Sequence, residues 1–429
     1  MILRWISGVR VVLVAATLSR AAWAQPKGAE PEAPTARVEV LPGSAYPAPR
    51  VRGIRGGSLW MDMHGLQWPY LPAIPGGPAT RVGISGSAWV DTSYRTVESG
   101  IPDTDPSVHE WRQQARMVLR ATPTFNASGD WFLQAQGELA LNGAAPAGLG
   151  DAIIADDLYV RLGKWNVFDV TVGRFQGWEI YHLGMGLDLF TVERQGAFTQ
   201  NNTPVDIYGV TDLWNRANGP GHGALHFYPT NFLRFELLGE VGSAARNQIG
   251  VRPVGILDYG FIKLKVGAEY ERQTPGQQSP DFKNSVVRRG FGGALQFVLD
   301  PYVELGVNAA EELVDTNNLQ GVADTGKSTT IYSFGGFANG RVVGPLLLGA
   351  GADFTHERNL NVNAATGAND IRTQTQFFGA VQYTLWERFF SKFVFAYANA
   401  EWNPLSNPPP VAQFRDKALS GRLRFMYIF

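Results

Sequence analysis

The amino-acid sequence predicts an all-β fold: a transmembrane, antiparallel, up-and-down β-barrel of sixteen strands. First, from Arg81 onward, segments of about 10 to 14 residues alternate apolar with polar or small side chains, as in a barrel whose two faces meet different solvents. Second, every second connection between these segments is tight. Third, the last segment ends on an aromatic residue, Phe429.

The composition agrees with this fold class. The 429 residues include 49 glycines, 12% aromatic residues and no cysteine. Without cysteine, neither a disulfide framework nor a thiolate metal site is available, and we expect no metal and no cofactor. After residue 24, no apolar run approaches the ~18 residues that a membrane-spanning helix needs. A closed barrel also satisfies every backbone polar group in lipid, and a large secreted β protein is the alternative at this point.

Residues 1–24 are predicted to be a cleaved signal peptide. Arg4 and Arg10 form a basic start, Val11–Leu18 is apolar, and Ala22-Trp23-Ala24 fits a cleavage site. The apolar run is too short for a membrane anchor, which is the alternative. Cleavage would remove three arginines and no acid from 37 basic and 38 acidic residues, leaving a net charge of −4. This charge argues against nucleic-acid binding.

Residues 25–80 form a separate segment with ten prolines. Because proline cannot donate a hydrogen bond to a sheet, we expect a periplasmic tail or linker here and the barrel in residues 81–429.

Sixteen segments have the length and alternation of barrel strands, with ends fixed only to within several residues. They are 81–95, 111–125, 130–142, 152–163, 167–176, 222–229, 231–242, 251–259, 261–272, 286–299, 301–311, 328–341, 344–357, 370–386, 389–402 and 413–429.

The connections after even-numbered segments are short, for example Trp165-Asn166 and Glu387-Arg388, whereas residues 98–109 and 312–327 are long connections of the other set. Outer-membrane barrels have short periplasmic turns and long extracellular loops. The pattern therefore predicts the bacterial outer membrane, with both chain ends in the periplasm.

The C-terminal segment predicts most clearly which residues face lipid and which face the lumen. Counting back in twos from Phe429 defines the face that we expect to contact lipid, with Tyr427 and Phe429 in an aromatic girdle. Arg422 and Arg424 then face the lumen. A terminal phenylalanine also resembles the signal that outer-membrane barrels present to their assembly machinery.

The longest connection, Gly177–Gly221, is rich in aromatic and apolar residues. A loop of this length is usually functional or disordered, and its composition argues against disorder. We expect it to fold into the barrel as a constriction loop that carries Asp188, Glu193 and Asp206. The alternative is a loop that caps the barrel or packs on a neighbouring subunit.

A set of arginines is predicted to form a basic wall inside the barrel. Arg112, Arg116 and Arg120 share one face by period two. Barrel closure places the last strand beside the first two, so Arg422 and Arg424 join them. A basic wall opposite carboxylates would set a field across the lumen and bias the passage of ions. The alternative is that these arginines are simply solvated.

Two segments resemble a motif of the phosphate-selective porin family of the O/P type. Asp156–Gly163 follows the pattern acidic-x-aromatic-x-basic, and Val170–Gln176 contains the Gly-Arg-Phe that leads into the constriction loop in that family. The resemblance implies a sixteen-stranded barrel that is usually a homotrimer. Phosphate-binding members line the constriction with many arginines and lysines, whereas this connection also carries several acids, so no phosphate-binding residues are carried over.

These features predict a porin, a water-filled channel for passive diffusion of small hydrophilic solutes and ions, in contact with outer-membrane lipid. The alternatives are a transporter of hydrophobic compounds with an N-terminal plug formed by Trp60–Tyr70, an outer-membrane enzyme, and a structural or assembly barrel. We expect no enzyme, because none of the six histidines has a recognisable catalytic or metal-ligand spacing. His222 and His226 would lie about 13 Å apart on one strand face, too far for a shared metal.

Overall fold

The computed structural model describes the barrel strands and most of their tight connections. The described residues are 80–98, 108–127, 130–144, 153–175, 177–178, 180, 221–242, 246–259, 261–275, 284–299, 302–318, 327–362, 369–386, 389–403 and 414–428. The predicted signal peptide (1–24), residues 25–79 of the proline-rich segment and Phe429 lie outside this set.

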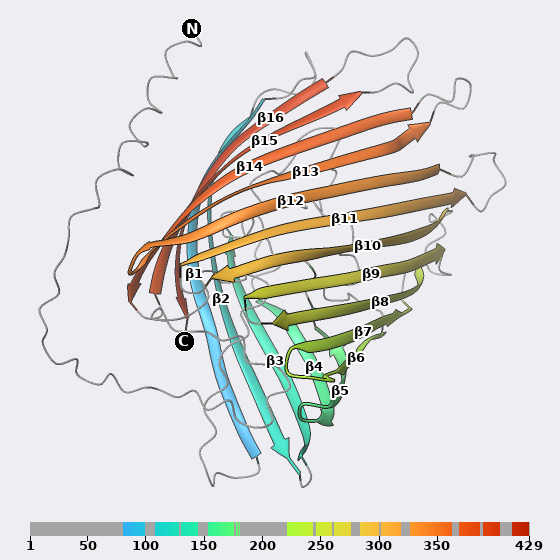
Figure 1. Ribbon diagram of the computed structural model, residues 1–429, viewed down its shortest axis with the longest axis vertical. Helices are drawn as coiled ribbons and strands as arrows, with labels where there is room; N and C mark the ends of the chain where they lie inside the picture. The colour runs from blue at the N-terminus through green and yellow to red at the C-terminus, as the bar shows by residue number, and fades with distance from the viewer. Residues whose placement is uncertain are drawn as a thin grey trace, which may run out of the picture. The chain divides into compact units, whose positions relative to one another are not determined.

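Sixteen antiparallel strands form one closed barrel, which confirms the predicted fold class (Figure 1). Each strand pairs with its neighbours in sequence, and β16 closes the barrel against β1. The strands are β1 (Thr80–Glu98), β2 (Val108–Asn126), β3 (Trp131–Ala144), β4 (Ile153–Lys164), β5 (Phe168–Arg174), β6 (Gly221–Phe227), β7 (Leu233–Val241), β8 (Arg246–Tyr259), β9 (Ile262–Pro275), β10 (Asn284–Leu299), β11 (Val303–Asn318), β12 (Lys327–Val343), β13 (Leu346–Val362), β14 (Asn369–Trp386), β15 (Phe389–Asn403) and β16 (Phe414–Ile428).

All sixteen predicted segments overlap an observed strand, but several strands are longer than predicted. β8 begins at Arg246 instead of residue 251, β11 ends at Asn318 instead of 311, and β13 ends at Val362 instead of 357. These ends are polar, so the apolar alternation fades there. Main-chain pairing continues regardless, for example between Asn284 and Asn318, because backbone hydrogen bonds do not require an apolar face.

The connections alternate in length as predicted. Those after even-numbered strands contain two to five residues. The others are longer, up to the connection between β5 and β6, except that four residues (242–245) join β7 to β8. In the tight connections, Asp130 and Asn166 adopt φ values of 65° and 58°, a left-handed conformation that Asp and Asn tolerate better than most residues.

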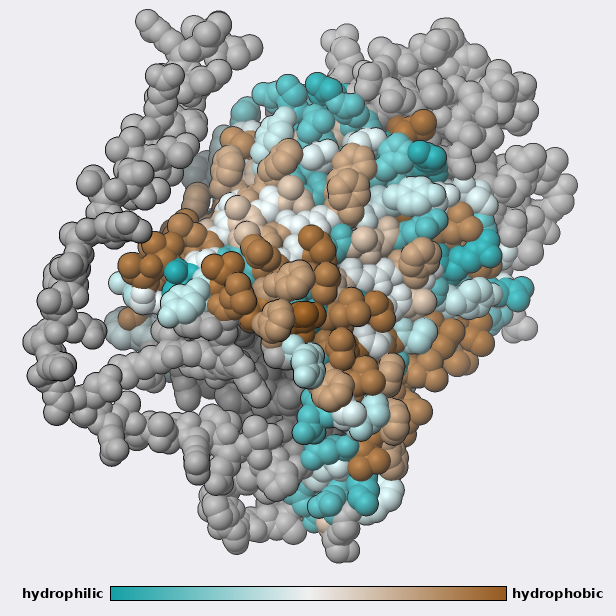
Figure 2. Space-filling view, in the orientation of Figure 1, coloured by the Kyte–Doolittle hydropathy of each residue, from teal (hydrophilic) through white to brown (hydrophobic). Residues whose placement is uncertain are grey.

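The two faces of the wall differ in chemistry. On β6, Leu225 and Phe227 are 45% and 47% exposed on the outer face, whereas His222 and His226 are buried on the inner face. The same alternation runs through β16, where Phe425 and Tyr427 point outward and Arg424 inward, as predicted. Figure 2 shows apolar side chains gathered over the strands on the face turned to the viewer. Within the described residues, no helix is long and apolar enough to cross a membrane.

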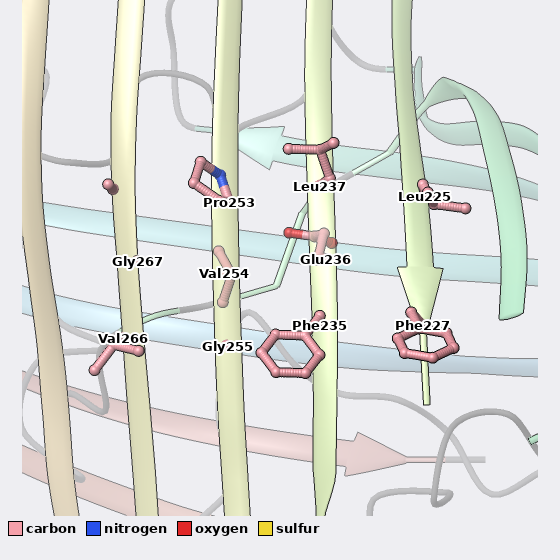
Figure 3. A pocket seen from close by; sticks show the side chains of 11 residues that line it. Leu225, Phe227, Phe235, Glu236, Leu237, Pro253, Val254, Gly255, Val266 and Gly267 are labelled. Atoms are coloured by element: carbon pink, nitrogen blue, oxygen red, sulfur yellow. The ribbon is translucent and has the colours of Figure 1, made fainter. Parts of the chain in front are cut away.

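An apolar groove of about 560 Å³ crosses the outer face of β6 to β9 (Figure 3). Pro253 and Gly255 are small residues of this face, with the larger Phe235 and Val266 beside them on the flanking strands. Aromatic rings also pair on the outer face near the tight connections, as in Trp131 with Phe168 at 5.7 Å between ring centroids. Such a surface suits contact with acyl chains and with the membrane boundary.

Candidate functional site

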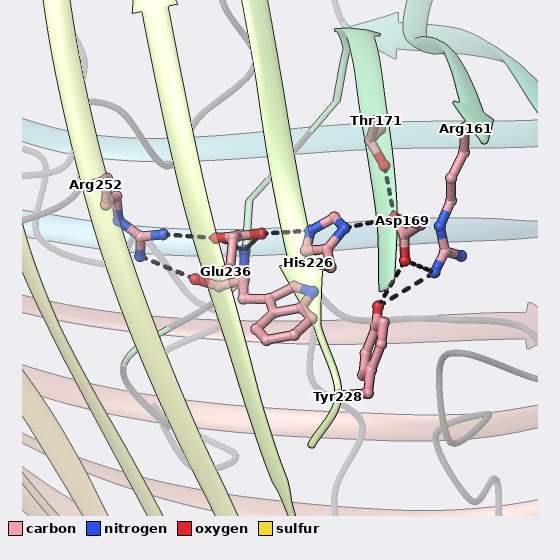
Figure 4. Close-up of polar contacts among 8 residues, drawn as sticks. Arg161, Asp169, Thr171, His226, Tyr228, Glu236 and Arg252 are labelled. Carbon is pink, nitrogen blue, oxygen red and sulfur yellow. Dashed lines mark hydrogen bonds and ion pairs between the residues drawn. The ribbon is translucent and has the colours of Figure 1, made fainter. Parts of the chain in front are cut away.

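The inner wall of the barrel carries a continuous line of buried charged side chains across β4 to β9. We call this line the charge chain, and one residue of each strand contributes to it. Its members are Arg161, Asp169, His226, Glu236, Arg252 and Glu269 (all but Glu269 are labelled in Figure 4). All six lie on the inner face and are at most 7% exposed.

The residues of the charge chain alternate between positive and negative charge from one strand to the next. Arg161 Nη2 donates to Asp169 Oδ2 at 2.6 Å, and His226 Nδ1 lies 2.7 Å from Asp169 Oδ1. On the other side of the ring, His226 Nε2 lies 3.0 Å from Glu236 Oε2. Arg252 then contacts Glu236 at 3.3 Å and Glu269 at 3.7 Å. Buried charges are tolerated in proteins when they are paired and hydrogen-bonded in this way.

His226 occupies the centre of the charge chain. Each of its ring nitrogens faces a different carboxylate, and an ionised carboxylate can only accept hydrogen bonds. Both contacts are therefore satisfied together only by the doubly protonated imidazolium ring. The two carboxylates lie on opposite sides of the ring, so this trio bridges three strands and does not surround a common point, as metal ligands would.

The connection between β5 and β6 begins on this part of the inner wall. The backbone N–H of Trp178 donates to both oxygens of Glu236, at 2.9 and 3.0 Å, and its carbonyl accepts from Arg252 Nη2 at 2.9 Å. The indole ring stacks on His226, with 4.9 Å between ring centroids and 17° between planes. The start of the connection is thus fixed to β6, β7 and β8 from inside.

Ile180 extends this contact towards β9. It is 1% exposed and clusters with Trp178, Val254 and Ile256. A Cβ atom added to Gly267 of β9 would lie 2.4 Å from Ile180 Cδ1, so the glycine gives the side chain room against the wall. From Gly177 to Ile180, the chain therefore crosses the inner wall from β5 towards β9, as the inward direction of the predicted constriction loop requires.

Replacing Gly267 by Val is expected to loosen the start of this connection, because the new side chain would overlap Ile180. The folded barrel in detergent should then be cleaved faster by added protease within residues 181–220. Gly239→Val is the matched control, since a Cβ atom there meets no atom closer than 3.9 Å. Equal cleavage rates for the two variants would contradict the packing of Ile180 against Gly267.

The structure brings together most of the predicted basic wall. Arg116 and Arg120 of β2 lie on the inner face, as do Arg422 and Arg424 of β16. Arg112 pairs in register with Ser93 of β1, and its side chain is not among the described ones. The predicted acids of the constriction loop, Asp188, Glu193 and Asp206, lie outside the described residues.

Carboxylates are built into the basic wall. Asp91 of β1 accepts two hydrogen bonds from Arg424, at 2.6 and 2.7 Å, and lies 3.3 Å from Arg422. Glu138 of β3 pairs with Arg120 at 2.7 Å. The Arg424 guanidinium also lies 4.2 Å from the ring centroid of Trp89. These pairs lower the net positive charge that the arginines alone would give.

Further acids line the inner face on strands outside the basic wall. They include Glu269 and Glu271 on β9, Glu304 and Glu312 on β11, and Asp353 and Glu357 on β13. In the closed strand order, β9 lies eight strands from β1 in either direction. Lys263 and Lys265 of β9 and Arg372 of β14 also face inward, so the lumen presents both charge signs.

Sequence reasoning recognised the polar faces but not the charge chain. The alternation already places Glu236 on the polar face of its strand. However, pairing across six strands depends on register, and period two defines only the face of each residue. The sequence feature that could have indicated the charge chain is the presence of charged inward residues on the strands that flank the longest connection.

No protein-family profile matches the chain, and no curated protein matches it. Several solved structures share its architecture. The outer membrane channel DcaP of Acinetobacter baumannii aligns with a TM-score of 0.53 and 11% identity, over 82% of this chain and 97% of that chain. An anion-selective porin from Comamonas acidovorans gives a TM-score of 0.52 and 11% identity, over 82% and 100%. OmpT of Vibrio cholerae, expressed in the outer membrane, gives 0.51 and 12%, over 84% and 100%. At these identities the likeness concerns the fold: this chain has the barrel architecture of outer-membrane channels.

Proposed function

We propose that the protein is an outer-membrane porin, which allows small hydrophilic solutes and ions to diffuse through a water-filled lumen. The outer face of the barrel is apolar and its inner face is polar, as expected when lipid lies outside and water inside. A barrel of sixteen strands is wide enough to enclose an aqueous channel. The resemblance to phosphate-selective porins and the likeness to solved channels support the same function.

The attachment of the β5–β6 connection to the inner wall is the observation that carries this proposal. Trp178 and Ile180 hold the start of the longest connection against the inner wall, a position from which its remainder would narrow the passage. A barrel of this size with a narrowed lumen selects solutes by size and charge. We infer that the rest of this connection forms the constriction and brings Asp188, Glu193 and Asp206 to face the basic wall.

The direct test is conductance in a planar lipid bilayer. The folded, purified protein is expected to insert in steps and to conduct with a linear current–voltage relation. Steady openings would distinguish a porin from a transporter with a plug, from a barrel enzyme and from a structural barrel. A folded, heat-modifiable preparation that inserts without conducting would overturn the proposal.

The basic wall is proposed to bias the passage of ions. Replacing Arg112, Arg116 and Arg120 together by Ala is expected to shift the reversal potential in a salt gradient towards cation preference, because three positive charges leave the lumen. Arg289→Ala, which removes an outward arginine of β10, provides the control. A reversal potential unchanged by the triple variant would mean that these arginines are only solvated.

We also propose that the protein assembles as a homotrimer, as the family resemblance implies. A structure of OmpT of Vibrio cholerae is described as a trimer form. The outer face of β16, β1 and β2 contains small residues such as Ala88 and Ala115, which would permit close approach of another copy. Native mass spectrometry in detergent should show three copies, and a stable single copy at all concentrations would contradict this assembly.

A further inference from the structure

On the outer face of β12 to β14, a cluster of polar side chains lies next to a cluster of aromatic side chains. We call it the Arg358 patch. Its members point outward and alternate with buried, inward residues such as Ser333, Thr355 and Gln374. The patch consists of Tyr332 and Phe334 on β12, Phe354, His356 and Arg358 on β13, and Thr373 and Phe377 on β14.

The polar part of the patch is internally ordered. Arg358 Nε donates to His356 Nε2 at 2.9 Å, and His356 Nδ1 lies 3.0 Å from Thr373 Oγ1. The Arg358 guanidinium carbon also lies 5.9 Å from the ring centroid of Tyr332. These contacts hold the arginine through its Nε atom, so the two Nη groups of its fork are left to face a ligand.

Two other outward arginines near the same end of the barrel are neutralised by a carboxylate. Arg289 forms an ion pair with Asp315, and Arg415 forms one with Glu401. Among the described residues, Arg358 forms no ion pair. The outward carboxylates of the two strands that flank the patch pair in register with other members: Glu311 of β11 with Tyr332, and Glu401 of β15 with Thr373. The patch therefore presents a positive charge to an anionic partner.

The apolar part of the patch marks the edge of the membrane-facing band. Phe334 and Phe354 lie 4.8 Å apart between ring centroids, and Phe334 and Phe377 are 56% and 53% exposed. Outward residues of β13 are apolar or small from Leu346 to Phe354. That stretch measures about 26 Å along the strand at the usual rise. With a strand tilt of about 35 to 45°, it spans roughly 20 Å of the ~25 Å height of the apolar band of outer-membrane barrels. His356 and Arg358 are the next two outward residues of β13, so they come near the edge of such a band.

We propose that the Arg358 patch binds a phosphate-bearing lipid of the surrounding membrane. The phosphate would lie against the Arg358 fork, which matches phosphate geometry, and an acyl chain would lie along Phe334, Phe354 and Phe377. Tyr332 suits the boundary between the two, because tyrosine favours membrane interfaces. The exposed rings favour a lipid over free phosphate, which would leave them unused. This proposal rests on the proposed function, since it requires a membrane around the barrel.

The test measures lipid binding to the full-length, folded protein in a neutral maltoside detergent by native mass spectrometry. The probes are lipid A, which carries two phosphates, and the same lipid after enzymatic dephosphorylation. Lipid A is expected to bind, and Arg358→Ala to weaken this binding roughly tenfold, as expected for a lost charge-assisted hydrogen bond at an exposed site. Arg358→Lys should retain part of the affinity.

Lys417→Ala is the matched control, because Lys417 is an outward cation of β16 near the same end of the barrel. It should bind lipid A like the unchanged protein. Equal binding by Arg358→Ala, or equal binding of the dephosphorylated lipid, would overturn the proposal. Full competition by inorganic phosphate at low millimolar concentration would identify an anion site instead of a lipid site and would also overturn it.

Conductance distinguishes this proposal from the proposed function. Arg358 lies outside the lumen, so Arg358→Ala should conduct like the unchanged protein in a bilayer. A protein that binds lipid A through Arg358 but never conducts would contradict the channel alone. A protein that conducts but binds lipid A independently of Arg358 would contradict the lipid site alone.

Discussion

Replacing Glu236 by Ala is expected to detach the start of the β5–β6 connection and to lower the free energy of unfolding by about 3 to 5 kcal/mol, the usual cost of leaving buried charges without their partner. Glu236 contacts His226, Arg252 and the backbone N–H of Trp178. Its removal leaves two buried cationic side chains short of a carboxylate. With the connection released, single-channel current should fluctuate more and its mean should rise.

Two measurements check this result: denaturant unfolding of the barrel in lipid vesicles, and single-channel recording. Glu236→Gln keeps the shape of the side chain and removes its charge, so it should lie between the Ala variant and the unchanged protein. Glu240→Ala removes another buried, inward carboxylate of β7 and serves as the matched control. If Glu236→Ala and Glu240→Ala have equal effects on current fluctuations, Glu236 has no special role in holding the connection.

Deleting residues 184–203 is expected to raise single-channel conductance markedly and to admit larger uncharged solutes. Trp178 and Ile180 start the connection on the inner wall, so we infer that its remainder occupies part of the lumen cross-section. Ion current through a water-filled pore grows with the open cross-section. The deletion leaves the charge chain and its contacts to Trp178 in place, so the barrel should remain folded.

Conductance and polyethylene glycol exclusion are the measurements for this deletion. Deleting residues 405–411 from the connection between β15 and β16 is the control, because nothing predicts that this connection enters the lumen. An unchanged conductance and exclusion limit after removal of residues 184–203 would place that segment outside the pore. The channel itself would then need another explanation for its selectivity.

The fold could be predicted closely because each strand separates lipid from water. In β16, period two alone distinguishes outward Phe425 and Tyr427 from inward Arg424, and the structure agrees. The prediction was weaker beyond the apolar band. The polar ends of β11 and β13 were missed, since their pairing depends on backbone hydrogen bonds and leaves little trace in hydrophobicity.

For the residues of the candidate site, the sequence predicts only which face of the barrel wall each side chain occupies. The inward direction of Arg116, Arg120 and Arg424 follows from periodicity, but their partners do not. Asp91 meets Arg424 because of the particular register in which β1 and β16 close. Likewise, His226 lies between Asp169 and Glu236 only because β5, β6 and β7 align at one level. Register across several strands is a three-dimensional property that residue alternation does not encode.

The closing pair Asp91 and Arg424 has a kinetic consequence. The other neighbouring strands are consecutive in the chain, and most of them form local hairpins; even β5 and β6, which have the longest connection, are far closer in sequence than these two residues, which are separated by 333 positions. The entropy lost on joining chain segments grows with their separation, so local hairpins are expected to form early and the seam last. Asp91→Ala should therefore slow the final closure of the barrel more than the collapse of its hairpins, and an open, gel-retarded intermediate should accumulate during refolding.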